Sequence, residues 1–317
     1  MIPYEPMLAT ALDYEHDENL RPLFTEQQFQ WTAEDKKDGI RSLLYLEPNC
    51  SNTRVLTRVK GKHTGEYADK YHHIPWLHID LLVDKPMVLD GEFTWGKNSR
   101  ETMSILGCKA SEAWKRQFDT RMVEFTAYDV LYADGDDWRY RTYERRSEAV
   151  KTFLEKINPR INSNWQLMFP VRSGHPKILW NLNAEGIMLK APGHFYQAGR
   201  RSEDWLKVKR FKKYIVVVTG HNWGKEGKTG QMVGKVGSLM VSMLDHRGIL
   251  MQVGNAGTGL DMAERNILQW PVRTVIEVAS SDVTEDGKLW HPRFLRPRPD
   301  LKIEDASLTQ LLSQLEV

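Results

Sequence analysis

Residues 33–46 read AEDKKDGIRSLLYL, a charged stretch that runs directly into an apolar, strand-like segment. The Asp-Gly pair marks a tight connection, because glycine accepts backbone angles that other residues avoid. Side chains of an extended chain alternate between faces, so Lys36 and Asp38 point one way and Lys37 the other. An amine and a carboxylate then share a strand end with Arg41 close by, which suits a phosphate-bearing ligand and a nucleophilic lysine. A solvated, charged hairpin is the alternative interpretation of this stretch alone.

Composition limits the classes of protein to which the chain can belong. Its 317 residues are enough for two domains, and a hydrophobic fraction of 41% supports real cores. A formal net charge of +2 does not by itself indicate nucleic-acid binding, so such a surface must come from local clusters of Lys and Arg. The two cysteines provide neither a disulfide framework nor a zinc quartet. No apolar run nears the roughly 20 residues that span a bilayer, and residues 1–19 do not read as a secretory signal. We expect a soluble, cytoplasmic protein without membrane association.

Short strands separated by turns dominate the chain up to about residue 210, after a polar lead-in over residues 1–30. Apolar runs predict strands at 31–37, 40–47, 54–60, 87–95, 123–132, 165–171, 185–190 and 205–209. Apolar residues at helical spacing predict helices over 142–157 and 175–183.

Two of these strands carry charged side chains among apolar ones. Asp90 and Glu92 share one face of the segment 87–95, and Lys207 and Lys209 alternate with core residues in theirs. Charges in apolar strands are costly unless they are paired or bind a ligand, so both segments indicate a site. An Asp-Gly hairpin turn would explain Asp90 but would leave Glu92 without a reason.

The pattern changes after Arg210 to short strands with Gly-rich turns. Strands are predicted at 214–219, 236–244, 248–253, 272–279 and 288–295, with one helix at about 260–268, which is typical of a small antiparallel barrel such as an OB-fold. The Gly-rich stretch 220–230 lacks the ending of a phosphate-binding loop, so we interpret it as a hairpin whose lysines could touch a phosphate backbone. A final helix over 305–315 presents four leucines to the barrel.

Taken together, these stretches resemble the covalent nucleotidyltransferases, and most closely the compact ATP-dependent DNA ligases of the bacteriophage type. The motifs occur in the family's order over nearly the whole chain. They are residues 36–41 (K-x-D-G-x-R), 57–58, 90–92, 128–129, 185–190, 205–209 and, only approximately, 293–302. Each motif alone is a weak signal, whereas the ordered set is specific.

The resemblance implies an α+β fold. Residues 1–210 would form a nucleotidyltransferase (adenylation) domain of antiparallel sheets with helices, and residues 211–317 a small OB-fold β-barrel. It also implies a three-step reaction: a lysine takes AMP from ATP, AMP passes to the 5′-phosphate of a nick, and the neighbouring 3′-hydroxyl attacks and releases AMP. Spacing to the Asp-Gly pair selects Lys36 rather than Lys37 as the catalytic lysine.

The resemblance also assigns roles to ten residues around this chemistry. Lys36 must attack as a neutral amine, which neighbouring cations and burial both favour. The implied ATP-binding residues are Glu34 and Tyr128 for the adenine, Arg41 and Arg58 for the ribose and phosphates, Glu92 for the ribose, Lys190, and Lys207 and Lys209 for the α-phosphate. A divalent ion, Mg²⁺ or Mn²⁺, is expected on the carboxylate of Glu185, with Glu92 as a second candidate ligand.

The implied substrate is nicked double-stranded DNA, bound by a monomer that acts in replication, repair or recombination. The basic segment 199–213, the hairpin 223–235 and the barrel would contact phosphates. Arg293, Arg296 and Arg298 would orient the pyrophosphate. Only 35 residues precede Lys36, which favours ATP over NAD⁺ as the nucleotide.

Two alternatives remain beside this interpretation. An RNA ligase or mRNA-capping guanylyltransferase shares the superfamily, but the segment 205–209 and the barrel favour a DNA ligase. A non-catalytic OB-fold protein that binds nucleic acid would not need acids and lysines inside apolar strands.

Overall fold

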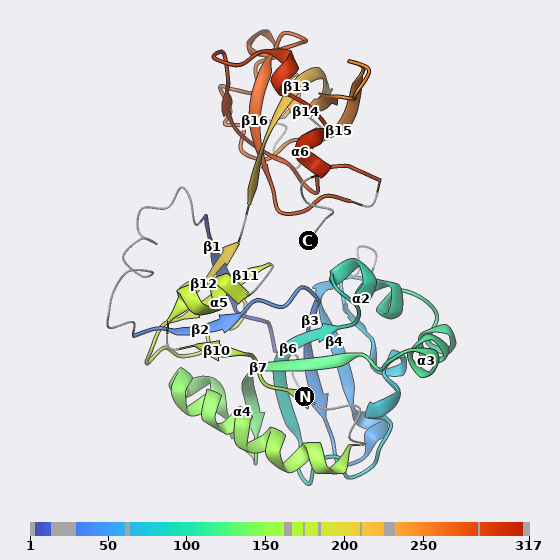
Figure 1. The fold of residues 1–317 in the computed structure, drawn as a ribbon. Coiled ribbons are helices and arrows are strands. Elements are labelled where there is room, and N and C mark those ends of the chain that lie inside the picture. The colour runs from blue at the N-terminus through green and yellow to red at the C-terminus, as the bar shows by residue number, and fades with distance from the viewer. Residues whose placement is uncertain are drawn as a thin grey trace. The chain divides into compact units, whose positions relative to one another are not determined.

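The computed structural model describes residues 4–13, 30–60, 64–161, 167–173, 175–182, 185–209, 211–224, 232–284 and 286–312. The chain separates into two compact units, of which one ends at Lys209 and the other starts at Arg210 (Figure 1). Both units are built mainly from strands. No helix in the described ranges is long and apolar enough to cross a membrane.

The larger sheet of the first unit includes the strand that directly follows residues 33–39. Its order is β5-β4-β3-β6-β7-β8, and β9 pairs with β7 in parallel. The strands are β3 (Ile40–Leu46), β4 (Arg54–Lys60), β5 (Tyr67–Asp69), β6 (Met87–Thr94), β7 (Glu124–Ala133), β8 (Asp136–Asp137) and β9 (Leu167–Met168). The helices beside it are α2 (Ser99–Leu106), α3 (Ala110–Asp119) and α4 (Tyr143–Ile157). Leu44, Leu89 and Phe125 of the sheet share one hydrophobic core with Ile105 of α2 and Phe153 of α4.

The register between β3 and β6 brings charged positions together. Arg41 of β3 lies opposite Glu92 of β6. The connection that leads into β3 is tight, because a Cβ atom at Gly39 would lie 2.1 Å from the carbonyl oxygen of Phe93. Only glycine permits this close backbone approach. The glycine of the Asp-Gly pair therefore allows the backbone at residue 39 to lie close to β6.

The smaller sheet of the first unit contains the strand that carries Lys207 and Lys209. Its order is β1-β12-β11-β2-β10, with β1 (Leu8–Asp13), β2 (Thr32–Asp35), β10 (Arg172–Ser173), β11 (Gly186–Lys190) and β12 (Arg201–Lys209). Helix α5 (Pro176–Leu182) packs against it through Leu179, which clusters with Ile187 and Val208. The pair β1–β12 runs parallel, whereas the other ladders of this sheet are antiparallel. The polar lead-in over residues 1–30 thus contains a strand, for which no prediction was made and which exists through pairing with the distant β12.

One predicted strand of the first unit is wrong in its extent. The segment 165–171 does not form a continuous strand: β9 and β10 are separate short pieces that belong to different sheets. Pro170 lies between them and has no N–H group to donate to a ladder. The break lets the chain leave one sheet and join the other.

The second unit is a five-stranded antiparallel sheet of order β15-β14-β13-β16-β17. Its strands are β13 (Lys212–Trp223), β14 (Val236–Leu244), β15 (Leu250–Ala256), β16 (Val275–Ser280) and β17 (Arg293–Pro297). Leu239, Ile276 and Phe294 contribute to its core. Within the described ranges no ladder joins β15 to β17, and a single bridge between Thr258 and Arg293 links the two ends of the sheet.

Of the two helices predicted in the second unit, one is absent from the described residues and the other begins later than expected. The segment 260–268 forms a turn and then enters the 3-10 helix Ile267–Gln269. Asp261 and Glu264 cap that one turn reciprocally, and the chain does not continue it as an α-helix. The last helix, α6, covers Thr309–Leu312. Residues 313–317, and residues 225–231 of the Gly-rich hairpin, lie outside the described ranges.

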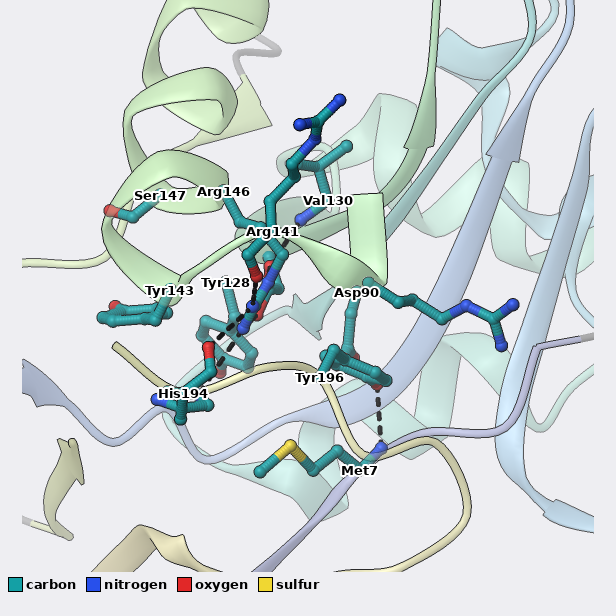
Figure 2. A network of polar contacts seen from close by, with 12 residues as sticks. Met7, Asp90, Tyr128, Val130, Arg141, Tyr143, Arg146, Ser147, His194 and Tyr196 are labelled. Atoms are coloured by element: carbon teal, nitrogen blue, oxygen red, sulfur yellow. Dashed lines mark hydrogen bonds and ion pairs between the residues drawn. The ribbon is translucent and has the colours of Figure 1, made fainter. Parts of the chain in front are cut away.

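A buried ion pair anchors α4 to the larger sheet. Arg146 of α4 and Asp129 of β7 are both fully buried and share two hydrogen bonds, of 2.7 and 3.0 Å. The Arg146 guanidinium also donates to the backbone oxygens of Arg141 and His194, at 2.6 and 3.1 Å (Figure 2). Buried charges require such complete sets of partners, since an unpaired ion in apolar surroundings is unfavourable.

The substitution Arg146→Leu is expected to lower the free energy of unfolding by about 3–5 kcal/mol, because it leaves Asp129 buried without its cation. Urea denaturation measures this change. Arg145→Leu is the matched control, since the neighbouring Arg145 is exposed and its loss should change stability little. Equal stabilities of the two variants would contradict the anchoring role of the pair.

Candidate active site

One cavity of about 450 Å³ lies within the first unit, and all ten residues assigned from the sequence line it. They are Glu34, Lys36, Arg41, Arg58, Glu92, Tyr128, Glu185, Lys190, Lys207 and Lys209. Eight of these side chains come from β2, β11 and β12 of the smaller sheet and from β3, β4, β6 and β7 of the larger sheet, and Lys36 and Glu185 lie next to β2 and β11. The cavity therefore lies where the two sheets meet.

Lys36 occupies the centre of a compact charge cluster. The strand predicted over 31–37 ends at Asp35, so Lys36 lies just beyond β2. Its Nζ atom is 2.6 and 2.7 Å from the two carboxylate oxygens of Glu185, which lies immediately before β11. Lys37 instead pairs with Asp35 at 2.7 Å. The two adjacent lysines thus have different partners, and only Lys36 lines the cavity.

Strand β12 adds positive charge to the same cavity. The Nζ atom of Lys209 is 2.9 Å from a carboxylate oxygen of Glu185, which therefore binds two lysines. Burial, together with repulsion from Lys209 and Arg201, lowers the pKa of Lys207. Arg58 of β4, which is exposed, lines the cavity as well. This concentration of cations is suited to the phosphates of a nucleotide.

Arg41 is held rigidly by a buried acid. Its guanidinium donates to both oxygens of Asp90, at 3.0 and 2.6 Å, and the hydroxyl of Tyr196 donates to the same carboxylate at 2.7 Å. Burial opposes the charged guanidinium, but attraction to Asp90 outweighs it and raises the pKa of Arg41. Asp90, which the sequence marks as a buried acid in a strand, therefore serves to position Arg41.

Glu92 has neutral partners rather than a cation. Its carboxylate accepts from the backbone N–H of Gly39 and from the hydroxyl of Tyr128, both at 3.0 Å. Burial raises the pKa of Glu92. A carboxylate that accepts from N–H and O–H donors is suited to a further hydroxyl, such as that of a ribose.

Glu34 belongs to a second buried charge cluster at the edge of the cavity. Its carboxylate is 2.7 Å from Nζ of Lys190 and 2.6 Å from a guanidinium nitrogen of Arg172, and it accepts from the hydroxyl of Tyr143. Burial opposes its charge, but Lys190 and Arg172 outweigh burial and lower the pKa of Glu34. The ionised carboxylate fixes Lys190 in the cavity wall.

Other residues that hold these charges in place carry no mark in the sequence. They are Tyr143, Arg172 and Tyr196, together with His194 and Trp205, whose contacts are described below. A buried acid in a strand indicates that a cation must pair with it, but the local sequence does not indicate which residue supplies that cation. Arg172 and Tyr143 reach Glu34 from segments more than a hundred residues away in the chain.

The described residues contain no group of three or more His, Cys, Asp or Glu side chains that could hold a metal ion. Glu185 is the carboxylate that pairs with Lys36 and Lys209. Mg²⁺ is commonly bound by one or two carboxylates together with substrate phosphates, so a single protein carboxylate here fits a metal that arrives with a nucleotide.

The sequence of this chain is similar to those of known DNA ligases. A family model for the ATP-dependent DNA ligase domain matches residues 6–209. A probable DNA ligase of Pseudarthrobacter chlorophenolicus is 27% identical over 261 residues, covering 78% of this chain and 46% of that protein. The multifunctional non-homologous end joining protein LigD of Mycobacterium bovis is 28% identical over 307 residues, covering 86% of this chain and 37% of that protein. The chain thus spans less than half the length of these two curated relatives.

The fold has a counterpart among solved structures. A structure from a structure-function study of Lig E DNA ligases matches with a TM-score of 0.61 and 22% identity, covering 92% of this chain and 98% of that one. The α+β fold predicted from the sequence is thereby confirmed.

Asp90→Asn is expected to lower the free energy of unfolding by about 3–5 kcal/mol, because it removes the charge opposite a nearly buried guanidinium. The side chains of Asp90 and Arg41 are 0% and 14% exposed. Urea denaturation measures the loss. Asp84→Asn is the control: its pair with Arg160 has a similar N–O distance, 2.7 Å, but Asp84 is 75% exposed, so its loss should have little effect. A small effect at both positions would refute the positioning role of Asp90.

Proposed function

Because the chain belongs to the ATP-dependent DNA ligase domain family, we propose that it seals nicks in duplex DNA through a lysyl-AMP intermediate. The observation that carries the proposal is the position of Lys36, whose amine lies in a cavity between the carboxylate of Glu185 and the lysines of β12. A structural lysine would need the carboxylate but not the surrounding cations.

In the first step the Lys36 nitrogen attacks the α-phosphorus of ATP. An N–P bond forms, the bond to the bridging oxygen breaks, and pyrophosphate leaves with its electron pair. The amine must lose its proton, and Glu185, at 2.6 Å, is the acceptor nearest to it in this cluster. Lys207 and Lys209 stabilise the charge that develops on the phosphate oxygens in the transition state.

The remaining wall of the cavity would bind the rest of ATP. Tyr128 offers an aromatic face for the adenine, and the buried pair of Glu34 and Lys190 offers polar groups at its edge. Arg41, fixed by Asp90, would hold the ribose and phosphates, as would Arg58. Glu92 would accept from a ribose hydroxyl.

A divalent ion, Mg²⁺ or Mn²⁺, would bind to Glu185 together with the phosphates. When bound, such an ion neutralises phosphate charge and helps to orient the leaving group. Glu92 was the second candidate from the sequence; its neutral donors favour the ribose role instead.

In the second and third steps AMP passes to the 5′-phosphate of a nick, and the adjacent 3′-hydroxyl then displaces it. We propose that the first unit is the adenylation domain, that the second is an OB-fold domain, and that a monomer binds nicked DNA. In the second unit Arg296 pairs with Glu277, and Arg298 with Asp300, at 2.8 and 2.7 Å. These contacts keep the basic segment 293–302 ordered within its own unit.

Incubation with α-labelled ATP and Mg²⁺ tests the nucleophile. The wild type is expected to take up acid-labile label, and Lys36→Ala to take up none, since no other amine replaces the reacting one. Lys37→Ala is the matched control and should label within about threefold of the wild type, because it removes no transition-state contact. Equal labelling of the Lys36 variant would refute the assignment.

A chase of the labelled protein identifies the substrate. Nicked DNA should release the label as AMP and yield a sealed strand. Release by nicked RNA but not by DNA would instead assign the chain to the RNA ligases. A protein that binds DNA but never takes up label would be the non-catalytic binding protein.

Removal of divalent ions tests the metal. Chelation with EDTA should abolish labelling, and restored Mg²⁺ should recover it. Glu185→Gln should slow labelling by about a hundredfold, because it removes a charged ligand and proton acceptor. Glu148→Gln, on the exposed face of α4, is the control and should label like the wild type. Labelling that persists in EDTA would exclude the metal.

A further inference from the structure

We propose that His194 is a positioning residue for the nucleotide site and that it acts through Trp205. The neutral imidazole accepts the indole N–H and thereby fixes the ring against which Arg41 and Lys190 rest. This inference rests on the proposed function, because Arg41 and Lys190 are residues proposed to bind ATP.

Trp205 joins the two cations at the base of the cavity. Its ring is 1% exposed and lies 5.4 Å from the guanidinium carbon of Arg41 and 4.4 Å from Nζ of Lys190. Arg41 comes from β3 of the larger sheet and Lys190 from β11 of the smaller one. Cations over an aromatic face are attracted to it, most strongly when they are desolvated. The orientation of one indole therefore affects nucleotide-binding groups on both sheets.

His194 fixes that orientation. The indole Nε1–H of Trp205 donates to Nε2 of His194 at 2.7 Å, while Nδ1 of His194 lies 2.5 Å from the carbonyl oxygen of Ala191. A carbonyl only accepts, so Nδ1 carries the hydrogen and Nε2 is free to accept from the indole. Both contacts are satisfied together in the neutral imidazole alone. The ring also stacks on Tyr143, with centroids 5.1 Å apart and planes at 15°.

The surroundings of His194 favour this neutral form. Burial is the main cause of the lowered pKa of His194, and Arg146 and Lys190 act in the same direction. The hydrogen bond to Ala191 and the charge of Asp129 oppose them, and a guanidinium nitrogen of Arg146 lies 3.5 Å from Nε2. The close-up in Figure 2 shows His194 beside Tyr143 and Arg146. The other facing groups are Tyr143 and Glu144, both from α4.

Protonation would reverse the contact with Trp205. A second N–H on the imidazole would face the indole N–H of Trp205. The imidazolium cation would also lie near the cations of Arg146 and Lys190. Because the pKa of His194 is lowered in the folded chain, the unfolded chain binds this proton first, and acid favours loosening of the site. Nucleotide affinity should therefore weaken as the pH falls through and below the ordinary titration range of histidine.

The test measures binding of α,β-methylene-ATP, which cannot transfer AMP, by calorimetry between about pH 7.5 and about pH 5.5, a range that spans histidine titration. His194→Gln keeps a side-chain oxygen that accepts from the indole and does not titrate. We expect its Kd at the higher pH to stay within about threefold of the wild type. The ratio of wild-type to His194→Gln Kd should rise by about tenfold on acidification, as the wild type loses its acceptor.

Two further variants separate positioning from packing. His194→Phe keeps the stacked ring but removes the acceptor and should weaken binding by about tenfold at both pH values. Trp205→Phe removes the donor together with part of the indole ring, so it should weaken binding at least as much, and the double variant should be no worse than Trp205→Phe alone. Trp205→Phe and His194→Gln keep the test decisive if His194→Phe does not fold. His72→Gln, on an exposed histidine, should keep the wild-type pH dependence.

A pH dependence of His194→Gln that matches the wild type, or additive losses in the double variant, would overturn the proposal. Labelling of Lys36 from ATP is measured on the same proteins. A wild type that labels and seals DNA while these variants bind normally would refute the role of His194 alone. A wild type that binds no nucleotide would refute the proposed function with it.

Discussion

The ion pair between Lys36 and Glu185 is the contact on which the arrangement of the cavity depends. It joins the end of β2 to the start of β11, and Lys209 of β12 binds the same carboxylate. Glu185 thus connects three neighbouring strands of the smaller sheet at one end of those strands. The amine is held in place before any ligand arrives, so little ordering of the lysine side chain remains for the nucleotide to bring about.

Paired charges also hold the rest of the cavity wall in place. Arg41, Glu34 and Arg146 are charged groups in largely buried positions, and each has an oppositely charged partner from another element. Such pairs add little to stability when compared with apolar packing, but they are severely destabilising when one member is lost. They make the geometry of the two sheets specific, because each pair is satisfied in only one relative placement of its strands.

The residues that line the cavity could be predicted from the sequence, whereas most of those that hold them in place could not. Lys36, Glu92 and Lys207 are marked locally, by an Asp-Gly turn or by charge inside an apolar strand. His194 has no such mark, because its role arises from a tautomer fixed by Ala191 and from an indole eleven residues further along the chain. The strand β1 was missed for the same reason. The segment 260–268, expected to be helical, forms a turn capped by Asp261 and Glu264 and then enters a short 3-10 helix.

The pairing of β1 with β12 covers the edge of a strand that lines the cavity. A fragment that begins at Trp31 would retain every motif of the chain, yet β12 would have an open edge where β1 now lies. Unpaired strand edges recruit strands from other molecules, and here the edge would belong to the strand that bears Lys207 and Lys209. Because β12 lines the cavity, self-association of such a fragment through this edge would obstruct the proposed active site.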